Sequence, residues 1–257
     1  MKPYGPDRFS SDLKDDVAAL WHWYDAAGSH LVTHEDGARL RAGGVPILMY
    51  RGRWKRAVQA CERRGIDPSM LADRVEASAR LRAGDGPAAG GDIAPFLDLL
   101  VGSFAEALAR LKGLRGSWQR RAAADFAHGL VLTQYLLAAP AFGERGVSLF
   151  CRSELDQAGL TVRAMASREM PTAYRALAWK QSIRARDSLA SARSLIVEMD
   201  LRERLYAKWV WHSALERLHA LEKQDFDVWA SKPALGPIAR TRVRIQSIFG
   251  RTAFRSA

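Results

Sequence analysis

The chain has 257 residues, 48% of them hydrophobic, and its 39 lysines and arginines outnumber 28 acidic residues to give a formal net charge of +11. A chain of this length can bury one substantial core, so we expect one domain over residues 1–257. The surplus charge predicts an anionic partner such as phospholipid, nucleic acid or diphosphate, although an arginine-rich composition also follows from genomic base bias. Nucleic acid ranks last, because no helix-turn-helix, RRM or finger signature accompanies the charge.

The two cysteines and the first residues bear on the compartment. Cys61 and Cys151 are far apart and form neither a disulfide nor a zinc pattern, which fits a reducing compartment only weakly. The first sixteen residues hold no apolar run that would read as a signal peptide. We therefore expect a cytoplasmic protein, with peripheral association at the inner membrane as an extension of that expectation.

The first predicted helix spans residues 11–27, where apolar residues recur at helical spacing behind serines that can cap it. Asp12 and Asp16 stand four apart, so a helix would place both carboxylates on one face, with Asp15 beside them. A functional carboxylate pair is one interpretation. We favour the other, a favourable acidic first turn on the helix dipole.

His30 and His34 also stand four apart, close to Glu35, a spacing that could chelate a metal if the segment were helical. Gly28 and Gly37 bracket the pair and favour a loop instead. We expect a loop here and predict no metal site in the chain.

Four segments follow in the middle of the chain. A basic helix is predicted over residues 47–64, ending at Gly65, and a second over 68–82 with Asp67 as its cap and Pro68 at its first position. The glycine- and proline-rich stretch 83–95 predicts a mobile loop within the domain. An apolar helix is predicted over 95–114, in which Gly102 would allow close helix contact.

The next helix begins near Trp118 behind Ser117, its predicted cap, and holds no carboxylate, lysine or arginine between Asp125 and Glu144. Its apolar residues surround the helix, which is typical of a position inside a bundle. The stretch is too polar and too short for a membrane span. Pro140 should end or kink it, because proline lacks an N–H group and clashes with the preceding turn.

Two further helices are predicted over residues 170–195 and 200–223, and no strand pattern appears anywhere. In the second of these helices, the spacing predicts that Trp209 points inward and that Trp211 lies at the margin. The other residues predicted to point inward are Leu205, Leu215, Leu218 and Leu221. The sequence thus predicts an all-α bundle.

The C-terminal segment 237–257 combines apolar residues with arginines. Such a helix can lie on an anionic membrane surface, and a docked terminal helix with its arginines in water is the alternative, although both can hold together. The residues predicted to contact a membrane are Arg240, Arg242, Arg244, Ile245 and Phe249.

The segment LTQYLLAAPAFGERGVSLFCRSELDQAGL, residues 132–160, resembles the second signature of squalene and phytoene synthases. The matching positions are Leu132, Thr133, Arg145, Gly146, Leu155, Gly159 and Leu160. In active members two aspartates of this signature hold Mg²⁺ against a diphosphate, and here Ala138 and Phe142 stand in their places. Neither side chain offers the oxygen ligand that magnesium needs. Active members hold their first aspartate-rich motif near this end of the chain. In the divergent segment 1–44 we expect that the motif has been lost or the segment truncated, and a displaced motif is the alternative.

A closer resemblance is to the squalene/phytoene-synthase-like assembly factors of respiratory complex I. It is carried by Leu137 to Gly146, by QDFDVW at 224–229 and by RIQSIF at 244–249, and it covers roughly residues 45–250. It implies an isoprenoid-synthase-type bundle whose central helices enclose an apolar pocket. The residues expected at the ligand site are Gln134, which stands where the family has the asparagine of its LTN motif, Thr133, Arg145 and Gly146.

These observations favour a non-catalytic protein with no catalytic residue and no cofactor. It would act as an assembly or scaffold factor at the inner membrane, with a respiratory-chain subunit as partner, or bind a lipid or isoprenoid. The alternative is an active head-to-head prenyltransferase that joins farnesyl or geranylgeranyl diphosphates, and only that alternative would require Mg²⁺. A third reading, an enzyme with other chemistry in the same pocket, has no nucleophile or base to support it.

Overall fold

The structure is a computed structural model that describes residues 11–28, 33–44, 51–231, 233 and 235–249. Every regular element in these ranges is helical and none is a strand, which confirms the all-α prediction. The helices are α1 (Ser11–Ala27), α2 (His34–Arg41), α3 (Arg51–Arg63), α4 (Asp73–Arg82), α5 (Ile93–Leu97), α6 (Ser103–Leu111), α7 (Ser117–Leu137), α8 (Ala139–Glu144), α9 (Arg152–Gln157), α10 (Tyr174–Ser191), α11 (Arg193–Glu198), α12 (Leu201–Lys223) and α13 (Pro237–Phe249). The extent of the domain over 1–257 stays a prediction.

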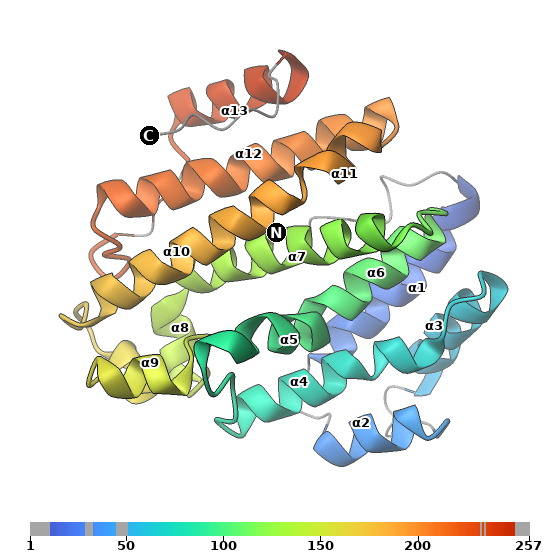
Figure 1. Ribbon diagram of the computed structural model, residues 1–257, viewed down its shortest axis with the longest axis horizontal. Helices are drawn as coiled ribbons and strands as arrows, with labels where there is room; N and C mark the ends of the chain where they lie inside the picture. Colours follow the sequence, from blue (N-terminus) through green and yellow to red (C-terminus); the bar gives the residue numbers. More distant parts are fainter. Residues whose placement is uncertain (1–10, 29–32, 45–50, 232, 234, 250–257) are drawn as a thin grey trace.

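The helix α7 runs through the middle of the bundle (Figure 1). It packs against α10 on one side and against α6 on another, while α12 also contacts it and α13 lies on α12 at the outer edge. Phe126, Tyr135 and Leu136 of α7 are completely buried, so the prediction of a helix inside a bundle is confirmed. Pro140 lies in the first turn of α8, directly after the break at Ala138, as expected. No described helix combines the length and the apolar character that crossing a bilayer would require.

The contact between α7 and α10 depends on a glycine. A Cβ atom added to Gly129 would lie 2.6 Å from Leu189 Cγ and 2.9 Å from the backbone oxygen of Ala185. The two helix backbones therefore approach more closely than any side chain at this position would allow. From α12, the Trp211 indole N–H donates to the Leu189 backbone oxygen at 2.8 Å and bonds a third helix to the same place.

The predicted helix 95–114 is interrupted by a π-helical turn over Asp98–Gly102, which separates α5 from α6. Gly102 permits the close contact expected of it, because an added Cβ would lie 2.9 Å from Asp98 Oδ1 and 3.1 Å from His128 Nε2. The turn brings Asp98 Oδ1 within 3.0 Å of His128 Nε2 of α7. The buried histidine of the central helix thus has a carboxylate neighbour.

Three predictions near helix ends or faces are wrong. Residues 34–41 form α2 rather than a loop, because Thr33 caps the helix and exchanges hydrogen bonds with Asp36; His30 lies outside the described residues. The cap of α7 is Gly116, whose N–H donates to Gln119 Oε1 at 3.1 Å, so Ser117 is already helical.

The third concerns α12, where Trp211 is buried and Trp209 only half-buried, the reverse of the expectation. Trp209 stacks on Tyr206 instead. The inward face of the helix is turned relative to the predicted one by its contacts with α7 and α10.

The glycine-rich stretch 83–95 is bonded to the start of α9. Arg152 N–H donates to Pro87 O at 2.9 Å, Ser153 N–H donates to Ala88 O at 3.0 Å, and the Arg152 guanidinium reaches Gly84 O. Ile93 already belongs to α5, so the predicted loop ends too late; its mobility stays a prediction.

Glu154 of α9 ties this region to α10. Its carboxylate is buried and accepts two hydrogen bonds from Arg184, at 2.6 and 2.9 Å, while Lys180 Nζ lies 2.5 Å away. Burial raises the pKa of Glu154, but the bonds from Arg184 and Lys180 outweigh it and lower the pKa from 4.5 to about 2.

Both cysteines are free thiols inside the protein. Burial is the main cause that raises the pKa of Cys61 to about 12 and that of Cys151 to about 11. They form no disulfide, as the sequence indicates.

We expect Gly129→Ala to lower the free energy of unfolding, because the new methyl group would overlap a backbone oxygen and overpacking of this kind typically costs about 1–3 kcal/mol. Gly52→Ala is the matched control, since Gly52 lies in α3 with open space around its Cβ position and gains only helix propensity, up to about 1 kcal/mol. Urea unfolding measures both; equal stabilisation of the two variants would contradict the close contact.

We expect Glu154→Gln to be less stable than the wild type at pH 7 by on the order of 2 kcal/mol, because two charge-assisted interactions are lost. Since the folded pKa lies below the unfolded one, the stabilisation is complete above about pH 4.5 and fades as the pH falls toward 2. Urea unfolding at pH 7 and pH 3 should show the difference shrinking, and Glu144→Gln, at an exposed site, should show none at either pH.

Candidate functional site

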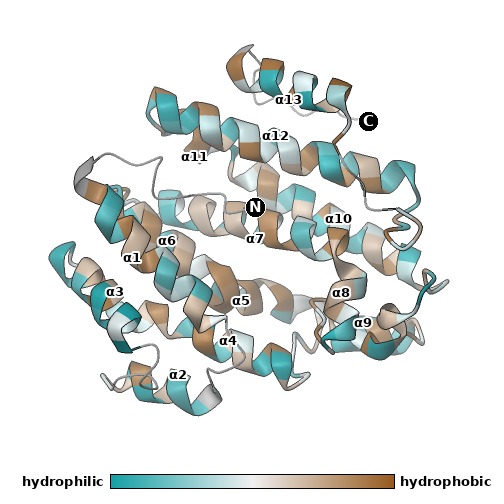
Figure 2. Ribbon diagram, turned by 180° about the vertical axis from the view of Figure 1, so that it is seen from behind, coloured by the Kyte–Doolittle hydropathy of each residue, from teal (hydrophilic) through white to brown (hydrophobic). Residues whose placement is uncertain are grey.

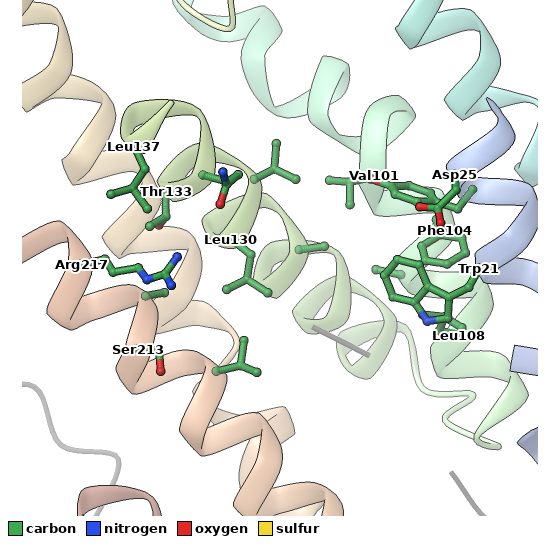
Figure 3. A pocket seen from close by; sticks show the side chains of 17 residues that line it. Trp21, Asp25, Val101, Phe104, Leu108, Leu130, Thr133, Leu137, Ser213 and Arg217 are labelled. Carbon is green, nitrogen blue, oxygen red and sulfur yellow. The ribbon is translucent and has the colours of Figure 1, made fainter. Parts of the chain in front are cut away.

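A cavity of about 270 Å³ lies between α1, α6, α7 and α12 (Figure 3). Its walls are mainly apolar. In the close view, Trp21 of α1 lies at one end of the cavity and the residues of α12 lie at the other. The main apolar residues are Trp21, Phe104, Leu108, Leu130, Leu137 and Val210. Figure 2 shows that hydrophobic residues also gather on the neighbouring helices where these face the interior. Such a space suits the apolar chain of a ligand.

Two of the four predicted ligand-site residues line this cavity and two do not. Thr133 and Gln134 of α7 belong to its lining. The Thr133 hydroxyl donates to the Gly129 backbone oxygen at 2.7 Å, so it is occupied within the helix, whereas Gln134 is exposed at the edge. Arg145 is exposed at the end of α8, and Gly146 borders a different cavity beside Gly84 and Gly86.

The cavity also contains polar groups that the sequence did not single out. Asp25 of α1 and Arg217 of α12 lie at opposite ends, as Figure 3 shows, and Ser213 stands one helical turn before Arg217. Of the described residues that line this cavity, Ser213 and Trp21 have a buried side-chain atom, Oγ and Nε1, without a hydrogen-bond partner. The four-residue spacing of Ser213 and Arg217, alongside the apolar Val210 and Ala214, was a signal available in the sequence.

Ala138 and Phe142, at the positions of the missing signature aspartates, are not among the described residues that line the cavity. Ala138 forms the break between α7 and α8, and Phe142 packs its ring 5.2 Å from that of Tyr135, in the hydrophobic core. The Tyr135 hydroxyl is in turn 3.0 Å from Ser148 Oγ. Core packing accounts for the aromatic ring at position 142.

The donor set does not fit a magnesium–diphosphate site. Asp25 is the only carboxylate among the described residues that line the cavity, and no group of three or more His, Cys, Asp or Glu that could hold a metal occurs in the described part of the chain. Magnesium is usually held by one or two carboxylates together with phosphate oxygens. A single carboxylate, at the opposite end of the cavity from Arg217, is a smaller donor set than the two aspartates of the family signature.

Asp15 and Asp16, near the start of α1, do not line this cavity. Asp16 is buried and pairs with Arg63 and with Arg64, the latter at 3.0 Å, so it joins α1 to α3. Asp15 is exposed, and the side chain of Asp12 lies outside the described residues. The structure therefore gives Asp16 a packing role.

A second cavity, of about 200 Å³, adjoins the first. Both are lined by Ala105 and Leu108 of α6, and the second continues toward Leu195 and Tyr206, where Lys112 pairs with Glu203 at its rim. His212, next to Ser213, is buried; burial, with repulsion from Lys208, lowers its pKa to about 4, so the imidazole is neutral at pH 7. The polar end of the first cavity thus holds one positive charge, that of Arg217.

The sequence profile of the squalene/phytoene synthase family matches residues 51–246 of the chain. No curated protein matches the chain.

Three solved structures resemble the fold. A dehydrosqualene synthase in complex with a ligand is 12% identical, with a TM-score of 0.73 over 95% of this chain and 89% of that one. The squalene synthase HpnC from Alicyclobacillus acidocaldarius is 12% identical, with a TM-score of 0.64 over 87% of this chain and 99% of its own. YisP from Bacillus subtilis subsp. subtilis strain 168 is 13% identical, with a TM-score of 0.66 over 93% and 87%. These likenesses confirm the expected isoprenoid-synthase-type bundle.

Proposed function

Because the chain belongs to the squalene/phytoene synthase family, we propose that it binds an isoprenoid or other lipid in the cavity between α1, α6, α7 and α12 without catalysing prenyl transfer. One observation carries this proposal. The cavity offers apolar walls but only Asp25 as a carboxylate among its described lining residues, while position 142 carries a phenyl ring packed on Tyr135.

The chemistry of prenyl transfer supports the same reading. Loss of a diphosphate requires concentrated positive charge on the leaving group, which metal ions supply in active members of the family. Arg217 is the only cation among the described lining residues. One guanidinium is a weak substitute for a metal cluster, so binding is favoured over turnover.

We further propose that the protein serves as an assembly or scaffold factor of the respiratory complex I type. The support is the resemblance of Leu137–Gly146 and of residues 224–229 to such factors. In this chain the second segment follows the C-terminal end of α12 and forms a hydrogen-bonded turn. The Gln224 amide donates to the Asp227 and Ser231 backbone oxygens, and the Asp227 carboxylate accepts from the Trp229 N–H. A protein partner would be a respiratory-chain subunit.

The proposal extends to the membrane surface through α13. Val243 and Ser247 are buried and α13 packs on α12, which agrees with the docked-helix alternative. The opposite face exposes Ile238 by 78%, Ile245 by 54% and Ile248 by 58%. Apolar side chains that face solvent beside arginines suit an interfacial helix.

The arginines of α13 differ in their contacts. Arg240 donates to the Leu235 backbone oxygen, Arg242 pairs with Glu216 at 3.4 Å, and Arg244 is exposed. Phe249 ends the helix, and its side chain lies outside the described residues. We propose that Ile245 and Arg244 contact an anionic bilayer while α12 holds the other face.

We expect the purified protein to bind farnesyl diphosphate in the presence of Mg²⁺ without releasing pyrophosphate. Leu130→Trp should fill the cavity and weaken binding at least tenfold, whereas Leu201→Trp, at an exposed site on α12, should leave it unchanged. Equilibrium dialysis with radiolabelled ligand and a pyrophosphate assay test both halves. Pyrophosphate release well above the blank would support the active prenyltransferase instead.

We expect the protein to sediment with vesicles rich in phosphatidylglycerol and much less with phosphatidylcholine vesicles, because each near-surface cation contributes on the order of 1 kcal/mol. Ile238→Ser with Ile245→Ser should lower the bound fraction strongly, and added salt should lower it further. Val197→Ser, which alters an exposed apolar residue of α11, is the control. Binding that is insensitive to both the double substitution and the lipid charge would rule out the α13 surface.

A further inference from the structure

Two polar side chains that line the cavity, Ser213 and Arg217, form no hydrogen bond or ion pair with another described residue. Ser213 is only 3% exposed, lines the cavity, and its hydroxyl has no hydrogen-bond partner among the described residues. Buried hydroxyl groups in folded proteins are nearly always paired, so an orphaned one at a cavity wall needs an explanation. A ligand atom is one partner that this position is open to receive.

Arg217 stands one turn farther along α12 and lines the same cavity. In Figure 3 its guanidinium extends toward Thr133 and Leu130, and no ion pair or hydrogen bond joins it to another described residue. Residues four apart on a helix share a face. Ser213 and Arg217 therefore present a hydroxyl and a forked cation to the same end of the cavity.

Two neighbouring polar groups are engaged with other partners. The Thr133 hydroxyl donates to Gly129 O, and Glu216, the carboxylate next to Arg217 in the chain, pairs with Arg242. Asp25 lies at the far end, on α1. The α12 end of the cavity is thus a place for an oxygen-rich, negatively charged group.

We infer that the cavity takes a ligand with an apolar chain and a singly charged carboxylate head, held by Ser213 and Arg217. This inference rests on the proposed lipid-binding function and gives its ligand a chemical class. A carboxylate matches the planar fork of arginine with two parallel hydrogen bonds and can also accept from a serine hydroxyl. A diphosphate carries more negative charge than one guanidinium balances, and the described lining adds no second cation.

In this arrangement the apolar chain of the ligand lies along the apolar wall of α7. Leu130 and Leu137 lie beside the α12 end of the cavity, and Phe104 and Trp21 lie toward its α1 end. The adjoining cavity at Ala105 and Leu108 gives a longer chain room to continue. The shared chemistry, an apolar chain with one carboxylate, belongs both to isoprenoid acids and to fatty acids.

The test compares ligands with one tail and different heads. Farnesoic acid, farnesol, farnesyl diphosphate without Mg²⁺ and the hydrocarbon farnesene are titrated into the full-length protein, with palmitoleic acid as the fatty-acid arm. We expect farnesoic acid to bind at least tenfold more tightly than farnesene and more tightly than the diphosphate. Whichever of the two acids binds better identifies the source of the chain.

Two variants separate head recognition from tail binding. Arg217→Met keeps an apolar stem and removes the charge, and Ser213→Ala removes the hydroxyl; each should weaken farnesoic acid at least tenfold and change farnesene less than twofold. Arg202→Met, at an exposed arginine of α12, should change neither. Circular dichroism and the melting temperature establish that each variant is folded.

The outcomes distinguish the two levels of the argument. Equal affinity for all heads, unchanged by Arg217→Met, overturns the carboxylate inference and leaves the lipid pocket standing. Tighter binding of the diphosphate than of the acid overturns it as well. Failure of every ligand, the hydrocarbon included, overturns the proposed lipid-binding function itself.

Discussion

The close approach of α7 and α10 at Gly129 is the constraint on which the rest of the bundle depends. The apolar residues of α7 from Phe126 to Leu137 must be covered by neighbouring helices, and α10 covers one side of them at backbone distance. The Leu189 backbone oxygen at this contact also accepts the Trp211 indole N–H, which bonds α12 to the same point. With α10 and α12 placed in this way, the remaining side of α7 faces α1 and α6 and borders the cavity.

The described lining of the cavity carries few charges, although the fold is that of the family. Its described lining carries one acid, Asp25, and one base, Arg217, at opposite ends. Phe142 fills hydrophobic space beside Tyr135, where the family signature has an aspartate. Under the proposed function the same scaffold would hold an apolar chain without the oxygens that bind metal, since shape and charge are set by different residues.

The sequence predicted some features that depend on local chemistry, although the caps of α2 and α7 were missed, and it missed several that depend on packing. The break before Pro140 follows from the ring itself, and the burial of α7 follows from its composition. The choice between Trp209 and Trp211 is decided by the neighbours of α12, which periodicity alone does not place. For the same reason Thr133 and Gln134 could be predicted by resemblance to the family signature, whereas Ser213 and Arg217 meet them only through the fold.

The burial of the two thiols allows transient opening of this protein to be measured. Cys61 and Cys151 are the only cysteines in the chain, and both are shielded and remain protonated near neutral pH. Alkylating reagents and mild oxidants require an accessible thiolate, so they should spare the native form. The rate at which a thiol reagent modifies the protein then measures how often the structure opens around α3 and the start of α9.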